Sequence, residues 1–289
     1  MRDKRVLADL ALLLAAVVWG GAFSTQRVAA AHLGHFLYNG LRFLLAVAVL
    51  LPFTRGRGDF TRFEWRGGVL AGVLLAAAAA LQQAGIASTT AGKAGFITSL
   101  YVVLVPLLLA LIWHRWPHWT AWIASGVATV GLFFLSVQGA WTLAPGDGLE
   151  LAGAVLWALH VIVIGRLSAR ADALRLSLVQ YLVCGVLNLA LGLTLEWGTL
   201  DGIPAAWWAI VYGGVFSVGL GYTLQVYGQK VAPATDAAIV LSLEAVFAAL
   251  GGWLLLDEAL TPVQILGCAL MMAGVLLAQV STLRRSRTE

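Results

Sequence analysis

Long apolar stretches follow one another along almost the whole chain, and they restrict it to a small set of folds. Each stretch holds about 20 residues, enough for an α-helix to cross roughly 30 Å of hydrocarbon. The stretches are continuously apolar and lack the period-two alternation of barrel strands, so helices are favoured over a transmembrane β-barrel. Ten of them can be marked, at residues 6–26, 34–54, 66–87, 93–113, 118–138, 148–168, 175–196, 204–228, 235–256 and 261–281.

Composition excludes a water-soluble domain of this length. Of the 289 residues, 61% are hydrophobic and only 11% are charged, whereas soluble domains carry about a quarter charged residues. The chain cannot cover a water-facing body with so little polar surface, and the lipid bilayer is therefore its expected surrounding. We expect an all-α integral membrane protein with ten transmembrane helices.

No motif in the sequence indicates catalysis, a cofactor or a metal. Cys184 and Cys268 lie inside apolar stretches and lack the spacing of metal ligands or of a disulfide framework. His114 and His118 are four residues apart, but they flank Pro117 in a basic turn and have no carboxylate partner nearby. We therefore predict that the protein is not an enzyme and holds no cofactor and no metal.

Arginine and lysine gather in alternate connections between the apolar stretches. With ten spans and both termini in the cytoplasm, all but three of the 18 basic residues fall on the cytoplasmic side or its flanks. The three exceptions are Arg27, Lys93 and Arg42. The net charge of +4 thus has a topological explanation and does not indicate nucleic-acid binding. The apolar N-terminal stretch is interpreted as a retained first helix because it lacks a convincing cleavage site.

The chain repeats itself at an offset of 143 residues. LQQAGIASTTAGKAGFITSLYVVLVPLLLALIWHR, from Leu81, aligns with LQVYGQKVAPATDAAIVLSLEAVFAALGGWLLLDE, from Leu224. This predicts two units of five helices, at residues 1–140 and 141–289. Since five is odd, the second unit must be inverted in the membrane. Inverted repeats are typical of alternating-access carriers with a midplane site, and one chain that holds both halves is compatible with function as a monomer.

Both units resemble the EamA repeat of the drug/metabolite transporter superfamily. The first unit carries VVWGGAF, Arg42 and TTAGKAGFITSLYVVLVPLL, and the second runs from VAPATDAAIVLSLEAVF to GCALMMAGVLLA. The features that match in the second unit are the S-L-E turn, Glu258, Thr261-Pro262 and the pair Gly267 and Gly274.

This resemblance implies a ten-helix secondary carrier of a bacterial-type inner membrane that exports small metabolites, commonly amino acids. Ala245 departs from the pattern because such repeats often have proline after the acid, so a less kinked ninth helix is expected here.

Three ionisable residues are expected near the middle of the bilayer. Counted from the ends of their spans, Glu244 and Arg42 lie about 12 Å deep and His160 about 15 Å deep. A charge at that depth costs roughly 2.5–3.5 kcal/mol and should face protein or water. Arg42 and Glu244 are candidates for a buried ion pair. Alternatively, Glu244 binds a proton or a substrate amine, and His160 relays protons or simply bonds to a neighbouring helix.

Aromatic and amide side chains mark the expected substrate cavity. Rings can stack on an apolar substrate, amides can bond its polar groups, and an acid can balance an ammonium. The predicted binding residues are Trp19, Gln82, Gln83, Tyr101, Trp157, His160, Tyr222, Gln225 and Glu244.

Two transport functions are consistent with these residues. The first is export of amino acids, including aromatic or hydrophobic ones, by alternating access around the cavity. The second is efflux of lipophilic or quaternary-ammonium cations with Glu244 as the coupling acid, although Arg42 at the same depth argues against it. An intramembrane enzyme would be expected to have paired acids or histidines, and a channel explains the inverted repeat less well.

Overall fold

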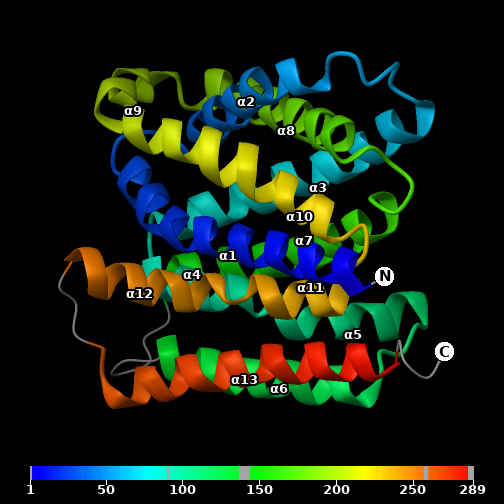
Figure 1. Cartoon of the computed structure of the whole chain (residues 1–289). Helices are drawn as coiled ribbons and strands as arrows, with labels where there is room; N and C mark the ends of the chain where they lie inside the picture. Colours follow the sequence, from blue (N-terminus) through cyan, green and yellow to red (C-terminus); the bar gives the residue numbers. More distant parts are fainter. Residues whose placement is uncertain (1, 90, 137–143, 257–259, 286–289) are drawn as a thin grey trace.

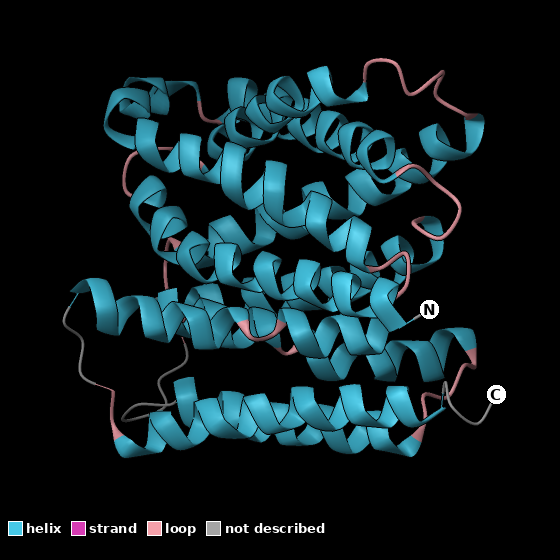
Figure 2. Ribbon diagram, viewed as in Figure 1, coloured by secondary structure: helices cyan, strands magenta, loops and turns pink. Residues whose placement is uncertain are grey.

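Helices make up the fold throughout the part of the chain that the computed structural model describes, residues 2–89, 91–136, 144–256 and 260–285 (Figures 1 and 2). Within these residues there is no strand. Glu258, one of the family features noted above, lies outside the described residues, as do the last residues of the 118–138 span. The helices run roughly alongside one another in layers, and α1 begins at the same end of the molecule at which α13 ends.

The elements follow the predicted spans closely. In chain order they are α1 (Arg2–Ala30), α2 (His35–Thr54), α3 (Arg62–Ile86), α4 (Ala91–Ser99), α5 (Tyr101–Trp113), α6 (Trp119–Ser136), α7 (Pro145–Leu167), α8 (Ala173–Leu195), the 3₁₀ helix η1 (Trp197–Gly202), α9 (Ile203–Val211), the π-helical η2 (Tyr212–Tyr222), α10 (Thr223–Gly228), α11 (Ala234–Leu241), α12 (Glu244–Leu256) and α13 (Pro262–Arg285).

Eight helical segments in the described residues are long and apolar enough to cross a membrane, judged by length and composition alone. They are α1, α2, α3, α4 with α5, α6, α7, α8, and the run from η1 to α10. A shorter apolar helix spans Pro262–Ala278. The all-α membrane class is thus confirmed, while ten crossings and the position of the termini stay predictions.

Two predicted spans are interrupted near their middle. Helix α4 ends at Ser99 and α5 begins at Tyr101, whereas α11 ends at Leu241 and α12 begins at Glu244. At each break the chain makes a tighter turn, with Leu100 N–H donating to Ile97 and Leu243 N–H donating to Val240, both at 3.2 Å. The ninth helix is therefore broken even though Ala245 replaces the expected proline.

Close approach of two backbones joins α6 to α13 at the lower edge of Figure 1. Gly131 and Gly267 face each other there: a Cβ on Gly131 would lie 2.7 Å from the Gly267 oxygen, and a Cβ on Gly267 would lie 2.6 Å from the Gly131 oxygen. Small residues permit such contacts in lipid, where van der Waals packing drives helix association. The glycine pattern noted in the sequence therefore has a packing role.

Candidate transport site

The two interrupted helices meet at the centre of the candidate site. Tyr101 is the first residue of α5 and Glu244 the first residue of α12, and the two positions correspond at the repeat offset. The Tyr101 hydroxyl donates to Glu244 Oε1 at 3.1 Å, and the Ser99 hydroxyl donates to the same oxygen at 3.2 Å. Glu244 is only 4% exposed. A buried acid that accepts from two hydroxyl groups thus lies where two interrupted helices meet, and interrupted helices are a feature of substrate sites in secondary transporters.

A small cavity of about 40 Å³ lies against this acid. It has room for a few water molecules and is far below the roughly 300–1,000 Å³ of a ligand pocket. The conformation therefore has a nearly closed site, which must widen to admit a solute. The lining residues come from both predicted units: Trp19, Ala22, Phe23, Gln26, Arg42, Gln82, Thr98, Tyr101, Trp157, Val161, Ser217, Tyr222, Gln225, Leu241 and Glu244.

Tyr222 gathers an aromatic cluster on one side of the cavity. Its ring centroid lies 4.6 Å from that of Trp19 and 5.8 Å from that of Trp157, with the Trp157 ring nearly parallel at 13°. The Trp19 indole donates to the backbone oxygen of Ser217 at 3.0 Å. Since Ser217 and Tyr222 lie in the π-helical η2, this irregular turn positions the aromatic wall. The arrangement presents ring faces suited to an apolar or cationic group.

Polar atoms of the lining side chains remain without protein partners. Among the described residues, Gln26 Oε1, Gln225 Oε1 and Trp157 Nε1 are buried and have no hydrogen-bond partner. Buried polar groups are nearly always satisfied, if not by protein then by water or ligand. These two acceptors and one donor therefore identify the cavity as a place where a polar molecule can bind.

The structure brings most of the predicted binding residues to this cavity. Seven of them line it, as does Arg42: Trp19, Gln82, Tyr101, Trp157, Tyr222, Gln225 and Glu244. Gln83 and His160 do not line it. The Gln83 amide donates to the backbone oxygen of Gln26 at 2.9 Å, and His160 Nε2 bonds to Gln180 Oε1 at 2.9 Å.

Arg42 and Glu244 border the same cavity without forming an ion pair in the described structure. Arg42 Nε donates to Asn39 Oδ1 at 3.0 Å, and its guanidinium lies 5.0 Å from the centroid of the Tyr38 ring. Glu244 bonds to the hydroxyl groups named above. Both charged side chains therefore line the cavity without pairing with each other, and each can meet a substrate group of the opposite sign once the cavity widens.

Ion pairs connect the two predicted units at both ends of the molecule. At the end where α1 and α11 begin, Arg5 Nη2 lies 2.9 Å from Asp236 Oδ2. At the other end, where α4 and α7 begin, the Lys93 ammonium pairs with the Asp147 carboxylate. Lys93 and Asp236 are equivalent at the repeat offset, and Arg5 stands one position from the equivalent of Asp147.

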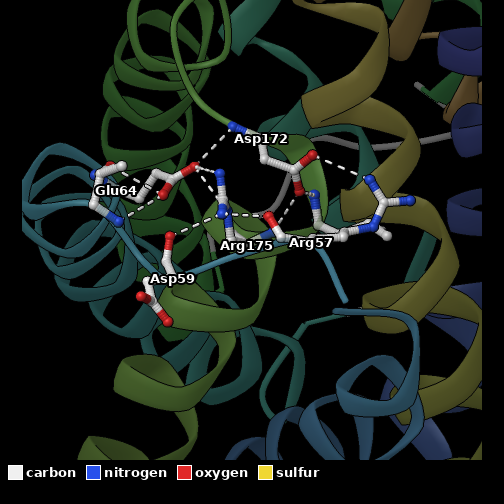
Figure 3. Close-up of polar contacts among 7 residues, drawn as sticks. Arg57, Asp59, Glu64, Asp172 and Arg175 are labelled. Carbon is white, nitrogen blue, oxygen red and sulfur yellow. Dashed lines mark hydrogen bonds and ion pairs between the residues drawn. The ribbon is translucent and has the colours of Figure 1, made fainter. Parts of the chain in front are cut away.

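A further charged cluster joins the α2–α3 connection to the α7–α8 connection (Figure 3). Glu64 accepts from Arg175 Nε and from the backbone N–H of Asp172, both at 3.0 Å. Asp172 also pairs with Arg57 at 3.2 Å. Partial burial opposes ionisation of Asp172, yet the Arg175 backbone N–H and the charges of Arg57 and Lys230 hold the pKa of its carboxyl below the usual range. The cluster secures these two connections to each other.

Sequence reasoning missed Thr98, Ser217 and Glu150. Thr98 and Ser217 line the cavity, but small hydroxyl residues are common in membrane helices and carried no distinguishing signal. Glu150 lies near the start of the predicted span 148–168, and no pattern in the sequence assigns it to the site. In the structure it is fully buried and accepts from the Thr98 hydroxyl at 3.0 Å. Phe23 and Gln26 also line the cavity, and they follow Trp19 by four and seven residues, a spacing that places all three on one helix face.

These helices, their apolar surfaces and the buried polar cavity define a multi-pass membrane protein of the transporter class. Residues 6–137 and 144–279 each match the EamA-like transporter family, and the chain belongs to that family. The resemblance to the drug/metabolite transporter superfamily is thereby confirmed. The family is one of membrane transporters.

Individual relatives agree with this assignment. The chain is 31% identical to an uncharacterized transporter of Archaeoglobus fulgidus over 281 residues, covering 96% of this chain and 87% of the relative. It is 26% identical over 190 residues to the threonine/homoserine exporter RhtA of Escherichia coli K12, an alignment that covers 63% of this chain and 61% of RhtA. A protein of known crystal structure superposes with a TM-score of 0.79 at 19% identity, covering 96% of this chain and 98% of that chain, which supports the fold.

Proposed function

We propose that the protein is a secondary carrier that exports small metabolites, most specifically amino acids, by alternating access around the cavity beside Glu244. The observation that carries this proposal is the pairing of a buried carboxylate with aromatic rings and unpartnered amides at the meeting point of two broken helices. The similarity to a threonine/homoserine exporter supports amino acids as the class. A bacterial-type inner membrane is the proposed location.

Ten crossings in two inverted units, 1–140 and 141–289, are part of the proposal. Three observations support them: the family matches twice along the chain, the helix breaks fall at corresponding residues, and α4–α5 runs opposite to α11–α12 in Figure 1. Packing supports them too, since α2 contacts α8 and α6 contacts α13, the equivalent helices of the two units.

The two inter-unit ion pairs provide a means to close the cavity alternately. With both pairs formed the cavity is small. Separation of Arg5 from Asp236 opens the end at which α1 begins, the proposed cytoplasmic side. Separation of Lys93 from Asp147 opens the opposite end and releases the solute outside.

The walls of the cavity match the chemistry of an amino acid. The Glu244 carboxylate balances the ammonium group, and the Arg42 guanidinium faces the carboxylate from another wall. Tyr222, Trp19 and Trp157 contact the side chain, which favours apolar and aromatic amino acids. Efflux of lipophilic cations is the second candidate, because Glu244 and the rings also suit a quaternary ammonium.

Flux measurements on reconstituted protein test the proposal. Proteoliposomes loaded with individual labelled amino acids are expected to release at least one of them faster than protein-free vesicles. Glu244→Gln is expected to reduce that rate at least tenfold, whereas Asp201→Asn, which neutralises an exposed acid outside the cavity lining, leaves it unchanged. Transport of quaternary-ammonium dyes with no amino-acid flux would overturn the amino-acid assignment in favour of cation efflux.

A further inference from the structure

Glu150 is a buried acid that the proposed transport site does not use. It lies in the second turn of α7, has no exposed surface, and is absent from the cavity lining. Its Oε2 accepts from the Thr98 hydroxyl, while its Oε1 has no hydrogen-bond partner among the described residues. A carboxylate buried with so few donors is costly when ionised and is stabilised by binding a proton.

Thr98 links Glu150 to the cavity. Gln82 Nε2 donates to Thr98 Oγ1 at 3.2 Å, and Thr98 in turn donates to Glu150 at 3.0 Å. Gln82 and Thr98 both line the cavity. In this arrangement the ionised carboxylate orients the Thr98 hydroxyl, which then accepts the Gln82 amide. A protonated carboxyl instead donates its O–H to the Thr98 hydroxyl. The hydroxyl then loses the acceptor that orients it toward the Gln82 amide.

The packing around Glu150 provides room for the carboxyl but no direct cation. Gly85 of α3 lies against it, so that a Cβ on this glycine would be 2.8 Å from Glu150 Oε1. The charged groups next to Glu150 along the chain and in space lie toward the end of the molecule where α4 and α7 begin. Asp147, one turn earlier on α7, pairs with Lys93 of α4, and Arg27 of α1 donates to backbone oxygens at the end of α3. In the described structure none of the basic side chains forms an ion pair with Glu150.

We infer that Glu150 is a proton-binding site that couples solute export to inward proton movement, a conclusion that rests on the proposed transport function. When the Lys93–Asp147 end is open, a proton from outside adds to the Glu150 carboxylate and forms one O–H bond. Loss of the hydrogen bond between Gln82 and Thr98 loosens the cavity wall and favours solute release. After the opposite end opens, the same proton leaves to the cytoplasmic solution, and the ionised carboxylate restores the order that binds the next solute.

Two transport modes measured on the same proteoliposomes test this inference. Counterflow of labelled against unlabelled substrate needs no proton movement, whereas a pH gradient drives transport only if protons are coupled to it. In wild type the pH gradient is expected to accelerate export about tenfold. In Glu150→Gln the pH gradient is expected to have almost no effect, so that the rate of export relative to counterflow is about the same with and without the gradient, because glutamine cannot carry the proton.

Two further variants separate coupling from structure. Thr98→Val keeps the acid but removes the link to Gln82, and it is expected to lower the same ratio. Glu150→Asp keeps a titratable group, and it is expected to retain coupling with a shifted pH profile, which a merely structural role would not produce. It also serves if the glutamine variant does not fold.

Proton release measured with a pH indicator gives an independent readout. Addition of substrate to the purified wild-type protein is expected to change the bound-proton count, and Glu150→Gln is expected to abolish that change. If Glu150→Gln keeps its gradient response, the inference is overturned. Wild-type counterflow without any proton coupling would overturn the inference but leave the transport function standing, whereas the absence of counterflow would overturn both.

Discussion

Replacing Lys93 by glutamine is expected to open the cavity toward the outside. The substitution removes the cation that pairs with Asp147, whose side chain is 8% exposed. Breaking a buried pair commonly costs about 3–5 kcal/mol. Asp147 keeps two other donors, the Thr89 hydroxyl at 2.9 Å and the Ala144 backbone N–H at 2.8 Å, and Lys93 is 26% exposed. We therefore expect the closed outer end to lose about 2 kcal/mol, a shift of about 30-fold between states.

Accessibility of a single cysteine measures this shift. Ser217→Cys places a thiol on the cavity wall in a background where Cys184 and Cys268 are replaced by alanine. A membrane-impermeant maleimide added outside intact cells is expected to label the Lys93→Gln variant at least tenfold faster than the parent. Labelling from the cytoplasmic side, measured in inverted vesicles, is expected to slow.

Arg5→Gln is the matched variant at the opposite end. It removes the partner of Asp236 and is expected to produce the reverse pattern, with faster labelling from the cytoplasmic side. If both substitutions accelerate labelling from the same side, or if neither changes the rates beyond threefold, the two ion pairs do not close opposite ends and the reasoning is refuted.

Three stability predictions concern residues away from the cavity. Arg175→Met leaves Glu64, whose side chain is 3% exposed, with fewer hydrogen-bond donors. It is expected to destabilise the protein by about 2 kcal/mol and to lower the melting temperature in detergent. An unchanged melting temperature would show that the cluster in Figure 3 is dispensable for stability. Gly131→Ala places a Cβ 2.6 Å from the Met271 nitrogen and is expected to lower the free energy of unfolding by about 2 kcal/mol. Gly126→Ala is the control, because Gly126 has open space around it, and it is expected to leave stability unchanged. Equal effects of the two substitutions would contradict the close helix contact. Because folding lowers the pKa of Asp172, the stabilisation from its carboxylate is present above the unfolded pKa of about 3.9 and is lost as the pH falls through the lower folded value. Wild type is therefore expected to melt at progressively lower temperature below about pH 4, and Asp172→Asn, which keeps a good helix cap, is expected to depend less on pH. Identical pH profiles of the two proteins would contradict this assignment.

Depth along a helix could be predicted from the sequence because the rise per residue is fixed. This predicted similar depths for Glu244 and Arg42, and in the structure both line the same cavity. The direction in which a side chain faces depends on neighbours that the sequence does not name. Gln82 and Gln83 are adjacent and point about 100° apart on α3, and only packing decides that Gln82 meets the cavity while Gln83 bonds to α1.

The ion pair between Arg42 and Glu244 failed to appear for a related reason. Opposite charges at equal depth need not be adjacent, and each found closer partners: Asn39, one turn earlier on α2, for the arginine and the Ser99 and Tyr101 hydroxyls for the acid. His160, predicted at a similar depth, bonds to Gln180 of α8 and does not line the cavity.

Helix breaks and burial near span ends were the least accessible features. The sequence gives no proline at Leu100 or Leu243, yet both spans break there. Glu150 lies near the start of the apolar stretch 148–168, and its position in the sequence does not indicate burial. Its burial results from Gly85 and Thr98, which come from two other helices, so that only the tertiary arrangement reveals it.

Counterflow tests the central proposal most directly, because it distinguishes a carrier that exposes one site alternately from a pore open to both sides. Proteoliposomes are loaded with a high concentration of the unlabelled amino acid that the flux screen identifies, and a trace of the labelled form is added outside. We expect transient accumulation of label above its external concentration in wild type and none in Glu244→Gln. Simple equilibration of the label, without an overshoot and regardless of the internal load, would contradict alternating access.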